Sequence, residues 1–241
     1  MQRQCLRILG IRIDDVTMDE AVERLAAFAA SGVCHHAVTV NPEFIMEAQK
    51  NAAFAAILNA ADLALPDGIG LVWAARWRGR PLRERVAGVD MVERLAAVAA
   101  QRGLRLFLLG AAPGVAEEAA AILAARYAGL VIAGTYAGSP RPEDDEAALS
   151  RIVSARPHIL LVAYGAPRQD EWIERLRARL PVGVAMGIGG AFDFISGRRR
   201  RAPVWLQRLG LEWLHRLYME PWRWRRMLAL PGFVWAVLRE Q

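Results

Sequence analysis

The sequence predicts an α/β fold, in which a mostly parallel sheet is covered by helices on both faces and followed by a C-terminal helical appendage. Three observations predict this class. From His36 onward, short runs of β-forming residues alternate with amphipathic stretches of about a dozen residues, as in βαβ units. Runs such as 104–109 and 158–163 are almost wholly apolar, as strands buried on both faces are. The composition then changes abruptly at Ser196.

Individual elements carry their own local signals. Thr17 and Glu20 are spaced as a capping box, and Pro42 suits the first turn of a helix, where its missing N–H costs little. The elements predicted in the first part of the chain are strands within 6–13, a helix over 17–31, a strand over 36–41, a helix over 42–60, a strand over 61–65 and a helix over 69–78. Those predicted after them are helices over 89–101, 115–127, 142–155 and 168–180, and strands over 104–109, 130–135, 158–163 and 182–188.

Composition limits the class of protein. A chain of 241 residues that is 54% hydrophobic suits one large domain with an appendage. Its two cysteines, Cys5 and Cys34, have neither metal-ligand nor disulfide-framework spacing. The N-terminus lacks the apolar region of a signal peptide, and no apolar run reaches the roughly 18 residues of a membrane span. These features predict a cytoplasmic protein.

Charge divides the chain into two parts. Residues 196–241 contain 10 arginines and 3 glutamates, which gives this segment a net charge of +7. Because the net charge of the whole chain is +6, residues 1–195 have a net charge of −1. The same segment holds five of the eight tryptophans. We therefore expect a catalytic domain over 1–195 and a basic amphipathic appendage over 196–241 that docks on an anionic membrane surface. The alternatives are a helix packed on the core with solvated arginines, and nucleic-acid binding, which the absence of a matching basic face on the body disfavours.

Polar and glycine residues follow the predicted strands at their carboxyl ends, where parallel α/β sheets collect ligands. Thr39 and Asn41 close one strand, and Asp67 closes the next within Pro-Asp-Gly. Glycine-rich turns let backbone amides approach phosphates, which favours a nucleotide or sugar nucleotide. The alternative is that Asp67 merely caps the following helix and that the glycines serve only the turns. Later strand ends carry Gly110, Tyr136, Tyr164, Gln169, Gly187, Gly189, Gly190 and Asp193.

Several familiar sites are absent from the sequence. It contains no dinucleotide fingerprint, P-loop or nucleophile elbow, and its four histidines lack metal-ligand spacing. No carboxylate pair is placed to hold a metal against a diphosphate, so we expect neither metal nor cofactor. Arginine must then supply the positive charge, and the appendage offers Arg216, Arg223 and Arg226 at helical spacing.

Seven strings occur in an order that resembles one family. They are Thr39-Val-Asn-Pro-Glu43, Pro66-Asp-Gly68, Arg85-Val-x-Gly88-x-Asp90, Gly165-x-Pro-x-Gln169, Gly187-x-Gly189-Gly190-x-Phe192-Asp193, Glu212-Trp-Leu-x-Arg216 and Glu220-Pro-x-Arg223-x-x-Arg226. From Ile8 to about Arg226 the chain is similar to the WecG/TagA/CpsF glycosyltransferases, glycosyltransferase family 26. The resemblance implies a Rossmann-like domain and an inverting, metal-independent transferase. Such an enzyme moves N-acetylmannosamine or glucose from a UDP donor to a polyprenyl-diphosphate-linked sugar during synthesis of teichoic acid, exopolysaccharide or another cell-surface polymer.

The same resemblance assigns roles to residues. It makes Asp67 the general base, lets Thr39 line the acceptor or donor pocket, and implies that Gln169, Tyr136 and Asp193 lie near the nucleotide. Asn41, at the same strand end as Thr39, is the third catalytic candidate. Three arginines, Arg216, Arg223 and Arg226, would complete the site when the appendage docks on the inner face of the cell membrane. The remaining substrate-binding candidates are Gly68, Arg85, Asp90, Gly110, Tyr136, Tyr164, Gln169, Gly187, Gly189, Gly190 and Asp193.

Two other functions fit the same residues less well: a nucleotide-dependent oxidoreductase on the same kind of sheet, and a non-catalytic membrane scaffold. The expected partners are the UDP-sugar donor, the polyprenyl-linked acceptor and the membrane, with no nucleic acid. The sequence leaves open whether the protein is a monomer or a homo-oligomer.

Overall fold

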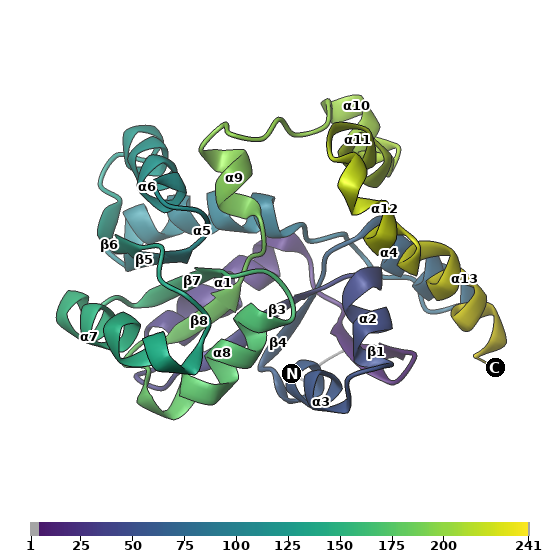
Figure 1. The fold of residues 1–241 in the computed structure, drawn as a ribbon, viewed down its shortest axis with the longest axis horizontal. Coiled ribbons are helices and arrows are strands. Elements are labelled where there is room, and N and C mark those ends of the chain that lie inside the picture. Colours follow the sequence, from purple (N-terminus) through teal and green to yellow (C-terminus); the bar gives the residue numbers. More distant parts are fainter. Residues whose placement is uncertain (1–4, 241) are drawn as a thin grey trace.

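A six-stranded parallel sheet, with strand order β4-β3-β8-β7-β5-β6, forms the centre of the molecule in the computed structural model (Figure 1). The structure describes residues 5–240, and for Arg208, Arg223 and Arg225 it describes the backbone alone. A separate antiparallel hairpin precedes the sheet. Parallel pairing throughout the sheet confirms the predicted α/β class. The strands are β1 Cys5–Ile8, β2 Ile11–Asp14, β3 His35–Val40, β4 Leu63–Pro66, β5 Arg105–Gly110, β6 Val131–Tyr136, β7 Ile159–Ala163 and β8 Val184–Gly187.

The helices between the strands begin and end close to the positions predicted, with one exception. Thr17 and Glu20 form the predicted capping box at the start of α1. The exception is the prediction of a single helix over 42–60, which is wrong. The chain forms two helices here, because the Asn51 side chain accepts a hydrogen bond from the Phe54 N–H at 3.0 Å and caps a new helix. The helices of the body are α1 Met18–Ala29, α2 Pro42–Ala48, α3 Ala52–Ala60, α4 Ile69–Trp77, α5 Gly88–Arg102, α6 Val115–Arg126, α7 Asp145–Ala155, α8 Arg168–Leu176 and α9 Ala191–Ile195.

Apolar side chains cover both faces of the sheet. Helices α1, α5, α6 and α9 pack on one face. On the other face, α7 and α8 cover one half, while the hairpin and α2, α3 and α4 cover the other half. Successive side chains of strand β5 point to opposite faces of the sheet. Leu106 and Leu108 pack against the helices α1, α5, α6 and α9, whereas Phe107 and Leu109 pack on the face covered by α7 and α8.

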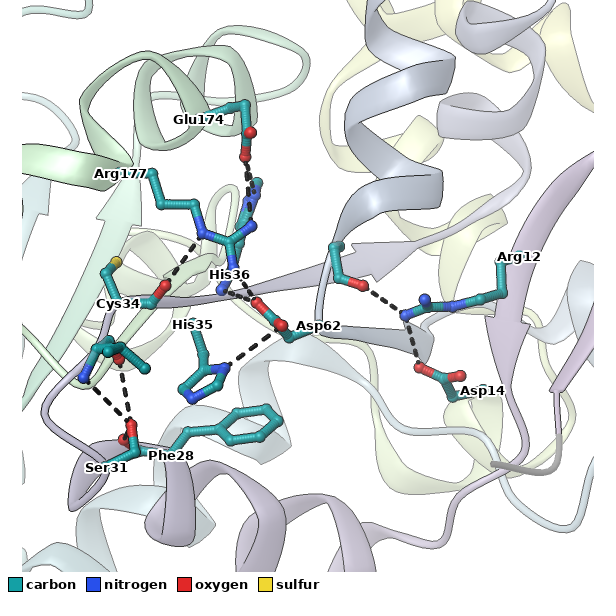
Figure 2. Close-up of polar contacts among 12 residues, drawn as sticks. Arg12, Asp14, Phe28, Ser31, Cys34, His35, His36, Asp62, Glu174 and Arg177 are labelled. Atoms are coloured by element: carbon teal, nitrogen blue, oxygen red, sulfur yellow. Dashed lines mark hydrogen bonds and ion pairs between the residues drawn. The ribbon is translucent and has the colours of Figure 1, made fainter. Parts of the chain in front are cut away.

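A polar cluster joins β3 and β4 to α8 at the amino ends of the strands (Figure 2). Asp62 accepts the backbone N–H of His36 at 2.9 Å and forms an ion pair with Arg177, which also donates to the Cys34 carbonyl. The His36 ring is fully buried, with Nδ1 at 3.6 Å from Glu174 Oε2. Burial alone would lower the pKa of His36, but the carboxylates of Asp170 and Glu174 raise it above its ordinary value. His36 therefore lies in the buried contact between β3 and α8.

The appendage follows α9 and runs along the side of the molecule formed by α2 and α4 (Figure 1). It contains α10 Val204–Arg208, α11 Glu212–Met219, the short turn η3 Pro221–Arg223, α12 Trp224–Met227 and α13 Ala229–Arg239. Helix α11 ends at Met219, and the chain breaks before Pro221. Phe233 and Val237 of α13 are buried in the same core as the hairpin, α2 and α4, and Glu240 accepts the Leu9 N–H at 2.8 Å. The last helix is thus packed into the body.

Across residues 5–240, none of the helices combines the length and the apolar character that crossing a membrane requires.

Candidate active site

A cavity of about 420 Å³ lies at the carboxyl edge of the sheet, between the body and the appendage. The ends of β3, β4, β7 and β8 and the start of α5 form one side of it. The opposite wall comes from the appendage, where the described lining residues are Arg199, Arg201, Gly210, Glu212, Trp213, Arg216, Arg226, Met227 and Leu230. Most of the site residues predicted from the sequence line it: Thr39, Asn41, Asp67, Gly68, Arg85, Tyr164, Gly189, Gly190, Asp193, Arg216 and Arg226. The fold thus brings together residues from seven segments of the sequence.

Asp67 directly follows β4 and faces this cavity. Its backbone N–H donates to the Val40 carbonyl at 2.8 Å, which holds the turn against the neighbouring strand. Its carboxylate Oδ2 accepts the backbone N–H of Gly88, the first residue of α5, at 3.2 Å. The alternative in which Asp67 caps the following helix is wrong, because α4 begins after Gly68 without any side-chain cap. The carboxylate therefore points away from α4 and toward α5.

Burial raises the pKa of Asp67 to about 6. The Gly88 N–H and the positive charges of Arg85 and Arg201 oppose this effect, whereas the negative charge of Glu212 adds to it. A carboxyl group with this pKa is mostly ionised at neutral pH, yet it is a stronger base than an exposed aspartate. These are the properties of a general base that works near neutral pH.

Thr39 and Asn41 flank Asp67 from the end of β3. The Thr39 hydroxyl donates to the Gly187 carbonyl at 3.2 Å, which joins β3 to β8 at the floor of the cavity. Asn41 uses its side-chain oxygen to accept the Phe44 N–H at 3.0 Å and so caps α2. Both polar groups are engaged with backbone, so these two residues shape the cavity around Asp67.

A network of ion pairs connects the appendage wall to the body. Glu212 accepts from Arg201 at 3.1 Å and from Arg85 at 3.4 Å. Arg201 also donates to Asp90 at 2.8 Å, and hydrogen bonding to this arginine lowers the pKa of the Asp90 carboxyl. Arg85 and Arg201 therefore stand within the cavity as guanidinium groups held by carboxylates from both parts of the chain.

Sequence reasoning did not include Arg199, Arg201 or Glu212 among the site residues. In the sequence, the run of four arginines from Arg198 to Arg201 marks only the boundary of the body. Its position directly after the glycine-rich end of β8 and α9 was the signal that could have identified it, because that strand end faces the cavity.

The two described arginines that the resemblance assigned to the appendage both reach the cavity. Arg216 lies with its guanidinium carbon 5.2 Å from the centre of the Phe194 ring. Arg226 forms an ion pair with Glu43 at 2.6 Å across the gap between α12 and α2. The side chain of Arg223 lies outside the described residues.

Two predicted substrate-binding residues support the glycine turn after β8 and do not line the cavity. Gln169 is fully buried, and its Oε1 accepts the Gly189 N–H at 2.9 Å. Gly187 faces Gln169 and Asp170 so closely that a Cβ atom at this position would lie 2.5 Å from Asp170 Oδ1. The two residues together determine the shape of the turn that carries Gly189 and Gly190.

Three further predicted residues also lie away from the lining. Asp90 is engaged with Arg201 as described. Gly110 ends β5 with φ of +98°, and a Cβ atom there would lie 2.8 Å from the Ala163 carbonyl carbon. Tyr136 ends the edge strand β6, where the Arg151 guanidinium covers its ring at 4.4 Å. Gly110 and Tyr136 thus lie at the ends of β5 and β6, and the described lining of the cavity does not reach these two strands.

Within the described part of the chain, no group of three or more histidine, cysteine, aspartate and glutamate side chains is arranged to hold a metal ion.

Comparison with known proteins assigns the chain to a family. The family described as glycosyl transferase WecG/TagA/CpsF matches residues 6–241. A Bacillus spizizenii protein is 40% identical over 204 residues, which cover 85% of this chain and 79% of the relative. A Staphylococcus aureus (strain MW2) protein is 30% identical over 234 residues, covering 96% and 91%. Both relatives are named N-acetylglucosaminyldiphosphoundecaprenol N-acetyl-beta-D-mannosaminyltransferase. The chain therefore belongs to the WecG/TagA/CpsF family of glycosyl transferases.

Proposed function

We propose that this glycosyltransferase moves a hexose or N-acetylhexosamine, such as N-acetylmannosamine or glucose, from a UDP-sugar to a polyprenyl-diphosphate-linked sugar. The reaction proceeds with inversion, needs no metal ion, and contributes to a cell-surface polysaccharide. The names of the relatives support the lipid-linked acceptor and favour N-acetylmannosamine as the sugar. The observation that carries the mechanism is the Asp67 carboxylate, which faces the cavity with its pKa raised to about 6.

In the proposed step, Asp67 takes the proton of the acceptor hydroxyl while that oxygen forms a bond to the anomeric carbon of the donor. The bond between the anomeric carbon and the diphosphate oxygen breaks on the opposite side, and UDP leaves with the electron pair. A single displacement of this kind inverts the anomeric configuration. It requires one base on the acceptor side, which Asp67 supplies.

The leaving diphosphate needs positive charge, and arginines of the cavity supply it. Arg85, Arg201 and Arg216 line the cavity from both the body and the appendage. Guanidinium groups bind phosphate oxygens in a bidentate manner and remain charged at every working pH. Preorganised positive charge of this kind stabilises the developing negative charge of the transition state, which is the basis for proposing metal independence.

The appendage completes the site and holds the enzyme at the inner face of the cytoplasmic membrane, where the lipid-linked acceptor resides. Its balance of +7 suits an anionic surface. Arg216→Ala tests the catalytic part of this proposal in detergent, where recruitment to a membrane plays no role. We expect a loss of turnover; unchanged turnover in detergent would contradict a catalytic role for Arg216.

The function is tested by incubating the protein with a panel of UDP-sugars and a short-chain polyprenyl-diphospho-N-acetylglucosamine, and reading product masses. We expect one added sugar, with inverted configuration by NMR, and full activity in EDTA. Activity that is lost in EDTA and restored by Mg²⁺ or Mn²⁺ would contradict metal independence. Binding of NAD(H) without binding of UDP would contradict the transferase itself.

A further inference from the structure

An apolar groove of about 810 Å³ lies beside the cavity, between α4 and the appendage. We infer that this groove binds the isoprenoid chain of the acceptor, an inference that rests on the lipid-linked acceptor of the proposed function. One wall presents Trp73 and Trp77 of α4. The other presents side chains of α11, α12 and α13, among them Trp213, Leu217, Val234 and Leu238. We call this feature the tryptophan groove.

The tryptophan groove is continuous with the active-site cavity. The two hollows share part of their lining, namely Pro42, Ile69, Gly70, Trp213, Met227 and Leu230. Ile69 and Gly70 begin α4, which starts two residues after Asp67. One ligand can therefore place its head beside Asp67 and extend its tail along α4.

The chemistry of the two hollows changes where they meet. The cavity is lined by Arg85, Arg201, Arg216 and other charged groups. Among the side chains that the structure describes, those lining the tryptophan groove are uncharged: they are aromatic, aliphatic, methionine, glycine and proline residues. A polyprenyl diphosphate has the same division, with an anionic head and a hydrocarbon tail, and a concave apolar site is what a hydrocarbon chain requires.

The exposed tryptophans of the described chain form two groups: Trp73, Trp77, Trp213 and Trp224 line the groove, whereas Trp205, Trp222 and Trp235 do not. Trp73 and Trp77 are 57% and 71% exposed and face the groove. Trp235 and Trp222 are equally exposed, at 58% and 71%, but neither lines the groove. The second group suits contact with the surface of a bilayer. The first group faces a hollow that is continuous with the cavity of Asp67. A single isoprenoid chain can enter this hollow, whereas the flat surface of a bilayer cannot.

The matched exposure of the two groups provides the test. KM is measured in detergent for two acceptors that share the diphospho-sugar head, one with a long isoprenoid chain and one with a short, water-soluble alkyl chain. In Trp73→Ser/Trp77→Ser we expect KM for the long-chain acceptor to rise about tenfold or more. We expect KM for the short-chain acceptor, KM for the UDP-sugar and kcat to stay unchanged. The control Trp222→Ser/Trp235→Ser should match the wild type in all of these.

A second measurement does not depend on catalysis. Titration of the wild type with farnesyl phosphate, which has no sugar, should change the tryptophan fluorescence with saturation, and the control variant should respond equally. The groove variant should show no saturable change. Equal responses of the groove and control variants, or the same KM change for long and short chains, would overturn the inference. A wild type that transfers no sugar but still binds farnesyl phosphate would contradict the proposed function and leave the groove supported.

Discussion

Among single residues, Asp67 is the side chain whose replacement we expect to cost the most activity. Asp67→Asn removes the base but keeps the size of the group, so we expect transfer to fall by about 100- to 10,000-fold. The folded protein should be at least as stable at pH 7, because the mutation removes a carboxylate whose folded pKa exceeds its ordinary value of 3.8. Transfer is measured by product mass and stability by thermal unfolding.

The exposed carboxylate of Asp19 on α1 provides the matched control. Asp19→Asn should leave transfer at the wild-type level. A loss smaller than about tenfold in Asp67→Asn would exclude Asp67 as the base, since general bases contribute more than this.

The pH profile should report the same carboxyl group. Because Asp67 must be ionised to accept a proton, kcat/KM should fall with decreasing pH below its pKa of about 6. Glu212 raises this pKa and Arg201 lowers it. Glu212→Gln should therefore move the acid limb to lower pH, and Arg201→Gln should move it to higher pH. If the fall of kcat/KM at acidic pH occurs at the same pH in both variants as in the wild type, another group is responsible for it.

The sequence was sufficient to predict the positions of Asp67 and its neighbours at the edge of the sheet, because each follows a recognisable strand. It was not sufficient to predict the network that surrounds them. The contact between Arg201 and Asp90 joins residues 111 positions apart, and that between Arg85 and Glu212 joins residues 127 positions apart. Such pairs depend on how the appendage lies over the body, and no local pattern encodes that placement.

For the structural elements, the sequence predicted the order of strands and helices well because apolar periodicity is a local property. It missed the separation of α2 from α3, because both segments are apolar on helical spacing and only the Asn51 side chain marks the new start. For the appendage, the sequence left open whether its helices pack on the core or dock on a membrane. In the structure, α13 packs in the core, and α11 and α12 lie over the cavity and groove.

Helix α13 should contribute to the stability of the whole body. Phe233 is only 2% exposed, whereas its neighbour Val234 is 54% exposed. We expect Phe233→Ala to lower the free energy of unfolding by about 3–5 kcal/mol, as large-to-small changes of a buried aromatic residue do. Val234→Ala, the control on the same helix, should change it by less than about 0.5 kcal/mol. Urea denaturation measures both, and equal effects would show that α13 does not pack in the core in solution.

The whole molecule is polarised, with a near-neutral body and a basic, tryptophan-rich appendage. We therefore expect it to bind vesicles that contain anionic lipid and to release them as salt increases, because surface charge attraction is screened over about 8 Å at physiological ionic strength. Cosedimentation measures this binding. Zwitterionic vesicles are the control, and equal binding to both kinds of vesicle at all salt concentrations would contradict an electrostatic contribution.

The packing of α13 against α2, α4 and the hairpin has a consequence for synthesis on the ribosome. The contact between Leu9 and Glu240 spans 231 positions, nearly the full chain. Since domains begin to fold while their C-terminal residues are still being made, the nascent protein must hold the apolar surfaces of α2 and α4 uncovered until α13 emerges. Nascent chains stalled before Phe233 should accordingly recruit chaperones that full-length chains release. Of the elements that line the tryptophan groove, α13 is the last to be synthesised.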